Sequence, residues 1–237
     1  MKLIITGATG FVGTAVLRAS LRDPRITTVV ALSRSQVVAT DCTDTPSDRT
    51  KLVSVLIKDY DDYPDNVRAH FAGAGACIWT VGITPAASKN YTWDEVRRVT
   101  HDCTVAGLNA MIAAHPAQPF RFVYMSGIAA ERDQTKTPPF LPEHGLLKGE
   151  VENSIIAIAA EHQNRTEIEP RFIKTALIVD EDKPMTEELK RRAEASKLPV
   201  VPLHGLARVM IDQTVKGFSK ESLLIDDILK LISSLPQ

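Results

Sequence analysis

The chain has 237 residues, of which 44% are hydrophobic and 24% charged, and its formal net charge is −1. This composition is that of an ordinary globular protein, and the near-neutral charge gives no electrostatic argument for binding nucleic acid or an anionic membrane. The sequence has no run of about 18 apolar residues that would span a membrane, and because the first predicted strand begins at once, we expect no signal peptide. The three cysteines lack metal-type spacing, so we expect reduced thiols, no metal site and a cytoplasmic protein.

The most informative segment follows the first predicted strand. Residues 3–6 form an apolar run typical of a buried strand, and the apolar positions of residues 14–21 recur at helical spacing. A strand, a glycine turn and a helix N-terminus in this order form an anion site, because free N–H groups and the helix dipole face the charge. This order predicts a dinucleotide pyrophosphate against the turn. The residues expected to bind it are Thr6, Gly7, Thr9, Gly10, Phe11, Val12 and Gly13.

Strand-like and helix-like segments alternate along the rest of the chain. Further strands are expected at residues 27–32, 52–57, 76–81, 120–125 and 171–178. Helices are expected at residues 64–71, 92–114, 148–162, 187–195, 207–215 and 223–232, and Thr92 is expected to cap the longest. The alternation predicts a single α/β domain over residues 1–237, a Rossmann-type doubly wound parallel sheet with helices on both faces.

Two proline-containing segments fit neither pattern well. They cover residues 128–145 and 179–205, and both follow the carboxyl ends of predicted strands. Ligands bind at these ends in open α/β sheets, so we expect the two segments to form the walls of a substrate site.

The end of the second predicted strand bears on the choice of cofactor. An acidic residue here would bond the ribose 2′-hydroxyl of NAD, but this chain has Ser33 and Arg34 and no acid. Arg34 can pair with a 2′-phosphate, and Ser33 can donate a further hydrogen bond. The alternative is that Arg34 is a solvated loop arginine. Because Arg34 stands where the acidic residue of an NAD site is expected, the sequence favours NADP(H) over NAD(H) as the cofactor.

The spacing of the three glycines, with Thr6 and Thr9 beside them, resembles that of the extended and atypical short-chain dehydrogenases/reductases. The likeness covers nearly the whole chain and is strongest to the Tat-interacting oxidoreductase-like branch, with NmrA-like regulators more distant. It rests further on residues 95–102, 147–152, 200–202 and 206–210. The resemblance implies that the adenine and its ribose lie beside Asp59, Tyr60, Thr80, Val81 and Gly82. An aspartate that opens a turn and a glycine that ends a strand are the simpler alternatives.

The same resemblance implies a catalytic serine after the fifth strand and a tyrosine four residues before a lysine. Ser126 and Lys148 match, but the tyrosine position holds His144. His144 could be a proton donor, a ligand-binding group in a protein that has lost the reaction, or a surface histidine. The segment Ile173–Ala176 also departs from the Arg-Pro-Gly of relatives.

These observations predict an NADPH-dependent oxidoreductase that acts on a small organic carbonyl substrate. In this hypothesis Lys148 holds the nicotinamide ribose, Ser126 orients the substrate oxygen and His144 donates a proton. The alternatives are a non-redox NADP(H)-binding regulator and an isomerase or lyase that uses Ser126 and His144 directly. The expected partner is a small molecule, and the sequence leaves a homo-oligomer open.

Overall fold

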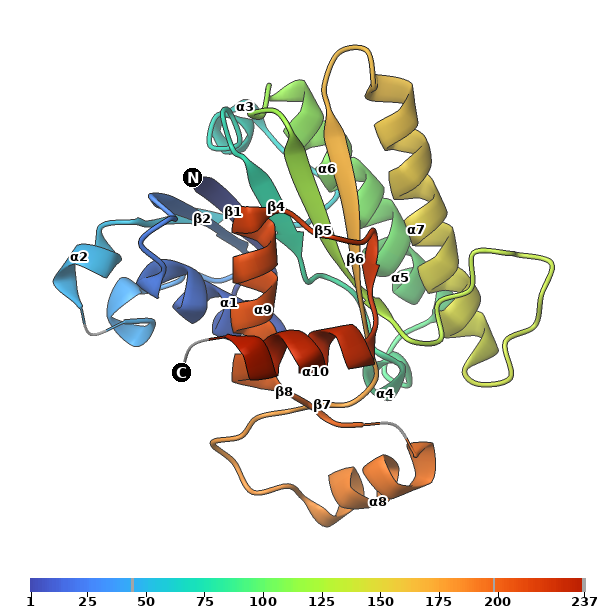
Figure 1. Ribbon diagram of the computed structural model, residues 1–237. Coiled ribbons are helices and arrows are strands. Elements are labelled where there is room, and N and C mark those ends of the chain that lie inside the picture. The colour runs from blue at the N-terminus through green and yellow to red at the C-terminus, as the bar shows by residue number, and fades with distance from the viewer. Residues whose placement is uncertain (44, 198, 236–237) are drawn as a thin grey trace.

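The computed structural model describes residues 1–43, 45–197 and 199–235. Seven strands form one sheet in the order β3-β2-β1-β4-β5-β6-β9, and all neighbouring pairs are parallel (Figure 1). The strands are β1 (Lys2–Thr6), β2 (Thr28–Ser33), β3 (Leu52–Leu56), β4 (Ala76–Trp79), β5 (Phe120–Gly127), β6 (Ile168–Thr175) and β9 (Ser222–Leu223). The order from β3 to β6 is that of doubly wound dinucleotide-binding sheets, which confirms the predicted fold class.

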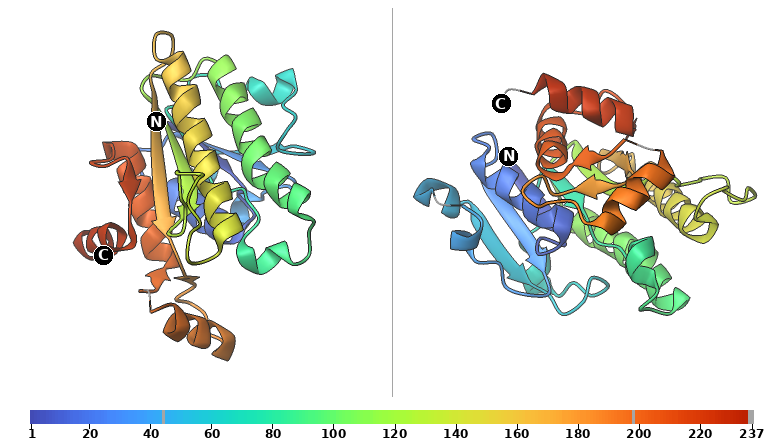
Figure 2. Two further views of the ribbon diagram at one scale, coloured as in Figure 1. Left: turned by 90° about the vertical axis from the view of Figure 1, so that its right-hand side faces the viewer. Right: turned by 90° about the horizontal axis from the view of Figure 1, so that it is seen from below.

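Helices cover both faces of this sheet (Figure 2). One face carries α1 (Phe11–Arg22), α9 (Leu203–Lys216) and α10 (Ile225–Ser234). The other carries α3 (Asp65–Arg68), α6 (Cys103–Ala113) and α7 (Pro142–His162). Because successive side chains of a strand point to opposite faces, Val123 belongs to the core under α1 and α9, while Phe122 and Tyr124 belong to the core under α6 and α7. The central strands are buried on both sides, as expected for a parallel sheet.

The long helix predicted over residues 92–114 consists of α5 (Trp93–Arg97), a π-helical turn (Arg98–Asp102) and α6. Its N-terminus is capped as predicted. The Glu95 N–H donates to Thr92 Oγ1 (3.3 Å), and the Glu95 carboxylate accepts from the Thr92 N–H (2.7 Å). This reciprocal capping box satisfies two donors at the helix start.

Several expected boundaries were wrong. Helix α7 begins at Pro142 rather than Lys148, so residues 142–145 are helical and not part of a loop. Proline suits the first helical turn, where its missing N–H is not needed. The predicted strand at 171–178 is divided between β6 and β7 (Ile178–Val179). Residues 203–205, expected in a loop, belong to α9, and Leu223, expected to begin a helix, belongs to β9.

A second, two-stranded sheet lies beyond the carboxyl ends of β5 and β6 (Figure 1). It pairs β7 with β8 (Val201–Pro202), and α8 (Glu187–Ser196) lies between them in sequence. The remaining short helices are α2 (Pro46–Arg49), α4 (Pro85–Ser88) and a 3₁₀ turn (Ala39–Asp41). Every helix in the described part of the chain is too short or too polar to cross a lipid bilayer.

Candidate functional site

The glycine turn lies between β1 and α1 at the carboxyl edge of the sheet. Gly7 has φ of +68°, a conformation that favours glycine. A Cβ on Gly13 would lie 2.0 Å from the Gly7 carbonyl oxygen, so α1 packs against the turn at a distance that only glycine permits. The helix begins after Gly10, and no side chain caps it. Since Thr9, Gly10 and Phe11 are exposed, the uncapped N–H groups are open to an anion, and the turn fits a pyrophosphate.

Two side chains expected to contact the cofactor hold this turn in place. The Tyr60 hydroxyl is buried beneath it, accepts the Gly7 N–H (3.0 Å) and donates to the Leu32 carbonyl (3.1 Å). Thr80 Oγ1 donates to the carbonyl of Thr6 (2.7 Å). These bonds tie the turn to the ends of β2 and β4. Tyr60 and Thr80 therefore hold the glycine turn in its position relative to the sheet.

The end of β2 presents one unpaired cation. Ser33 is buried, and its hydroxyl donates to the carbonyl of Ser35 (2.6 Å), so its hydrogen is not directed toward a ligand. Arg34 is exposed and makes no hydrogen bond or ion pair with any described residue. The charge of Arg34 acts on the nearby Asp59 carboxylate and lowers its pKa, but the guanidinium hydrogens make no bond to the described residues, so they can bind a phosphate.

Asp59 lies at the same edge but is already paired. One carboxylate oxygen accepts the Tyr60 N–H (2.7 Å), and the other accepts Arg98 (3.0 Å). Arg98 also bridges to Asp61 (2.6 Å). Burial alone would raise the pKa of Asp59, but the two hydrogen bonds and the positive charges of Arg98 and Arg34 outweigh it and lower that pKa. A bond from an adenine amino group would therefore compete with, or add to, an existing ion pair.

Lys148 reaches from α7 to the end of β5. Its Nζ donates to the Tyr124 hydroxyl (2.9 Å) and to the Met125 carbonyl (2.9 Å). A Cβ on Gly82 would lie 3.5 Å from the same Nζ, so the loop after β4 and α7 meet at this amine. Burial lowers the pKa of Lys148 to about 8, and the Glu152 carboxylate opposes that shift. The amine is therefore mostly protonated at pH 7.

The contact between Lys148 and Tyr124 was not predicted, because Tyr124 lies inside a strand. The two-residue repeat of side-chain direction in a strand was the available signal. It places Tyr124 and Ser126 on the same face of β5, the face that α7 covers. Tyr124 is fully buried, and burial raises its pKa well above 10. It therefore serves as a neutral hydrogen-bond partner of the lysine.

Ser126 belongs to a buried polar cluster that sequence reasoning missed. Its Oγ lies 2.5 Å from Oε1 of Glu152, a fully buried residue of α7. The other oxygen of Glu152 accepts Arg132 Nε (2.7 Å) and Lys174 Nζ (2.9 Å). A carboxylate has only acceptors, so the Ser126 hydrogen points at Glu152 and the serine offers lone pairs to any other neighbour. Lys174 comes from the segment that departs from the family pattern.

This cluster makes Glu152 a strong determinant of stability. Glu152→Ala leaves Lys174 and Arg132 without their buried counter-charge, and we expect a loss of about 3–5 kcal/mol in the free energy of unfolding. Urea denaturation followed by circular dichroism measures it. Glu150→Ala is the matched control, because Glu150 also pairs with an arginine (Arg97) on the same helix but both side chains are partly exposed. That control should cost about 1 kcal/mol or less, and an equal loss in both variants would contradict the assignment.

His144 lies one helical turn before Lys148 and packs edge-on against Trp93, with ring centroids 5.1 Å apart at 75°. Its Nε2 is buried and has no hydrogen-bond partner among the described residues. Burial lowers the pKa of His144, Lys148 lowers it further, and Glu143 opposes both. The imidazole is therefore mainly neutral at pH 7, and its buried Nε2 has no partner among the described residues.

The segment after β5 forms a wall fixed to α7. A Cβ on Gly149 would lie 1.7 Å from the Glu131 carbonyl oxygen, and one on Gly145 would lie 2.5 Å from that of Ala129. The Glu131 N–H also donates to the Gly145 carbonyl (3.0 Å). Residues 128–141 are thus held against the start of the helix that carries His144 and Lys148.

Comparison with known proteins gives one relative of similar sequence. No protein-family model matches the chain. "Leucinostatins biosynthesis cluster protein T" of Purpureocillium lilacinum is 29% identical over 128 residues, which are 53% of this chain and 42% of that protein. The chain thus covers less than half of the length of this relative.

Solved structures of similar shape are more numerous. Yeast methylglyoxal/isovaleraldehyde reductase Gre2, complexed with NADPH, has a TM-score of 0.72 and 14% identity over 95% of this chain and 78% of its own. A short-chain dehydrogenase/reductase of Saccharomyces cerevisiae has a TM-score of 0.69 and 14% identity over 99% of both chains. The chain has the fold of the short-chain dehydrogenases/reductases. Vestitone reductase from alfalfa (Medicago sativa) shares it, with a TM-score of 0.64 and 17% identity over 94% of this chain and 76% of its own.

Within this short-chain dehydrogenase/reductase fold, two groups can be distinguished among the predicted site residues. The glycine turn, Arg34, Gly82 and Lys148 lie on segments that follow the carboxyl ends of neighbouring strands or pack against them. Ser33, Tyr60 and Ser126 direct their hydroxyl hydrogens at protein atoms. The first group can meet a ligand directly, and the second shapes the surface that the ligand would meet.

Proposed function

We propose that the chain is an atypical short-chain dehydrogenase/reductase and an NADP(H)-dependent oxidoreductase of a small organic carbonyl compound. The observation that carries the proposal is the free Arg34 guanidinium at the end of β2, beside an uncapped glycine turn. A pyrophosphate at the turn and a 2′-phosphate at Arg34 would together account for both features. The NADPH complex of Gre2, which has the same fold, supports this choice of cofactor.

The remaining cofactor contacts belong to the loop after β4 and to α7. Val81 and Gly82 would lie along the adenine ribose, and Lys148 would bond the nicotinamide ribose with its third N–H. When bound, NADPH supplies a hydride. The protein must then supply the proton, and His144, with an unpartnered buried nitrogen one turn from Lys148, is the candidate.

Ser126 has a more specific role in this proposal than the sequence suggested. Because Glu152 takes its hydrogen, Ser126 can accept a hydrogen bond but not donate one to a substrate carbonyl. It would therefore orient the hydroxyl group that a carbonyl becomes on reduction.

The cofactor preference is tested at Arg34. Arg34→Ala removes a charge-assisted hydrogen bond, which is worth about 1.5–3 kcal/mol, so the Kd for NADPH should rise roughly 10–100-fold. The Kd for NADH should hardly change, because NADH has no 2′-phosphate. Isothermal titration calorimetry with both cofactors measures the two effects. Arg68→Ala is the control, since Arg68 is an exposed arginine of α3 paired with Asp65. Equal affinities of the unaltered protein for NADPH and NADH would remove Arg34 from this role.

The second candidate function is a non-redox NADP(H)-binding regulator on the same fold. Two observations favour it: His144 is mainly neutral at pH 7, and the Ser126 hydrogen is directed into the protein. NADPH binding with no oxidation across a panel of aldehydes and ketones would select this function over the first. An isomerase or lyase would instead convert a carbonyl compound with no net change in NADPH absorbance.

A further inference from the structure

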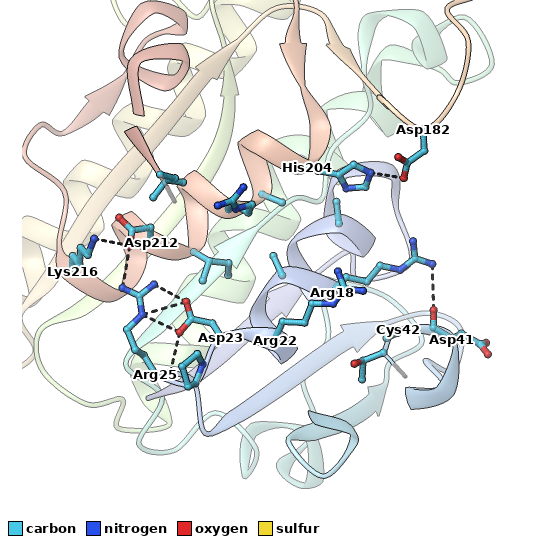
Figure 3. Close-up of a pocket in the computed structure, with 18 of the residues that line it drawn as sticks. Arg18, Arg22, Asp23, Arg25, Asp41, Cys42, Asp182, His204, Asp212 and Lys216 are labelled. Atoms are coloured by element: carbon cyan, nitrogen blue, oxygen red, sulfur yellow. Dashed lines mark hydrogen bonds and ion pairs between the residues drawn. The ribbon is translucent and has the colours of Figure 1, made fainter. Parts of the chain in front are cut away.

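A cavity of about 790 Å³ lies between α1 and α9, on the face of the sheet opposite α7 (Figure 3). Its volume is within the range of small-molecule sites. Side chains of α1, α9 and the turn around Asp41 line it, together with Leu235 near the end of the described chain. Its apolar part is formed by Ala15, Ala19, Ala207, Ile211 and Leu235.

The acidic groups at one end of the cavity are already neutralised. Arg25 pairs with Asp23 (2.6 Å) and with Asp212 (3.0 Å), and Lys216 also pairs with Asp212 (2.9 Å). Figure 3 shows this network beside the start of the loop that follows α1. The two cations of this network thereby balance the charge of its two carboxylates.

At the other end, a histidine and two aspartates border the cavity. Asp182 lies 2.8 Å from His204 Nε2, and the Asp41 carboxylate is exposed. In total the lining has five arginine and lysine residues and four aspartates, so its net charge is positive with a neutral histidine.

The positive charge comes from three arginines that have no carboxylate partner among the described residues. They are Arg18 and Arg22 of α1 and Arg208 of α9, all exposed. Arg18 donates only to the backbone carbonyl of Asp41 (3.2 Å). Arg18 and Arg22 are four residues apart on one helix face, where two like charges repel. An anion between the two helices would neutralise this repulsion.

We propose that this cavity binds a small organic phosphate. The phosphate would lie against Arg18 and Arg22, one helical turn apart on α1, because the guanidinium fork matches phosphate oxygens in pairs, and Arg208 would add positive charge from α9 across the cavity. The organic part would pack on the alanines and Ile211. A simple inorganic anion would use the arginines alone and leave this apolar surface uncovered.

The proposed site is separate from the glycine turn. Arg18 follows Gly10 by eight residues, which is about 12 Å along the axis of α1 at 1.5 Å per residue. It also lies on the side of α1 that faces α9, whereas the turn faces the carboxyl edge of the sheet. The two sites should therefore bind their anions independently.

The test is calorimetric titration of the Gly10→Val variant, which is designed to block the proposed phosphate site at the turn, with inorganic phosphate and with phenyl phosphate. We expect both to bind, and phenyl phosphate to bind more tightly than inorganic phosphate because of the apolar surface. Arg18→Ala and Arg208→Ala in this background should each raise the Kd at least tenfold. Arg68→Ala, an arginine outside the cavity, should leave it unchanged.

Three results would overturn the proposal. One is the absence of binding at millimolar phenyl phosphate in the unaltered chain. Another is binding that disappears with Gly10→Val, which would place the anion at the turn. The third is a Kd that does not respond to Arg18→Ala or Arg208→Ala while thermal melts show both variants folded. The outcome is independent of the proposed oxidoreductase function, because a failure to bind NADPH would leave these titrations unaffected.

Discussion

Replacement of Gly10 by valine is expected to abolish NADPH binding while the chain remains folded. Gly10 has φ of −81° and ψ of 172°, extended values that valine readily adopts. A Cβ there would meet only the Gly7 carbonyl oxygen, at 3.1 Å. Glycine is thus needed at this position for the ligand rather than for the backbone. A branched side chain over the helix N-terminus would exclude the pyrophosphate, and we expect the Kd for NADPH to rise on the order of 10³-fold, about 4 kcal/mol.

Calorimetric titration measures the loss of binding, and a circular dichroism melt shows that the fold is kept. Gly73→Ala is the control for backbone strain, because Gly73 has φ of +68° and open space around it away from the turn. It should lower the melting temperature without changing the Kd for NADPH. Gly7→Val should instead unfold the turn, since its φ is +68° and its Cβ would lie 2.7 Å from Thr80 Oγ1. NADPH affinity unchanged by Gly10→Val would mean that the phosphates bind elsewhere.

His144→Ala is expected to lower turnover of a carbonyl substrate by roughly 10²–10⁴, the usual contribution of a general acid. The Kd for NADPH should hardly change, because the contact with the ribose is assigned to Lys148. Only the imidazolium can give a proton, and burial lowers the pKa of His144 below 6.5. Turnover should therefore rise as the pH falls toward that pKa and decline above it. A further decline is expected above about pH 8, where Lys148 loses its proton.

Steady-state kinetics by NADPH absorbance between pH 5 and 9 check both parts of this prediction. His162→Ala is the matched control, because His162 is at the far end of the same helix and bonds only the Ile158 carbonyl among the described residues. It should leave kcat unaltered. Full turnover in His144→Ala, or a pH profile that His144→Ala does not move, would remove the histidine from proton transfer. Gain of carbonyl reduction in His144→Tyr would show that the surrounding site still supports hydride transfer.

The sequence by itself determined the elements whose signal is local. The strand, glycine turn and helix at residues 2–22 and the capping box at Thr92 each depend on residues within a few positions of one another. The alternation of strands and helices then determined the parallel sheet, because right-handed crossovers leave few other arrangements. Boundaries were less certain where proline allows both a loop and a helix start, as at Pro142.

The tertiary structure alone decided which polar atoms remain available. Ser126, Glu152 and Lys174 lie on three different elements, and only their packing directs the serine hydrogen into the protein. The bond from Lys148 to Tyr124 joins residues 24 positions apart, and the arginines of the cavity come from helices at opposite ends of the chain. A residue type shows what chemistry a side chain can perform. Whether its donor or charge is already satisfied depends on neighbours that are distant in sequence, and these are brought together only by folding.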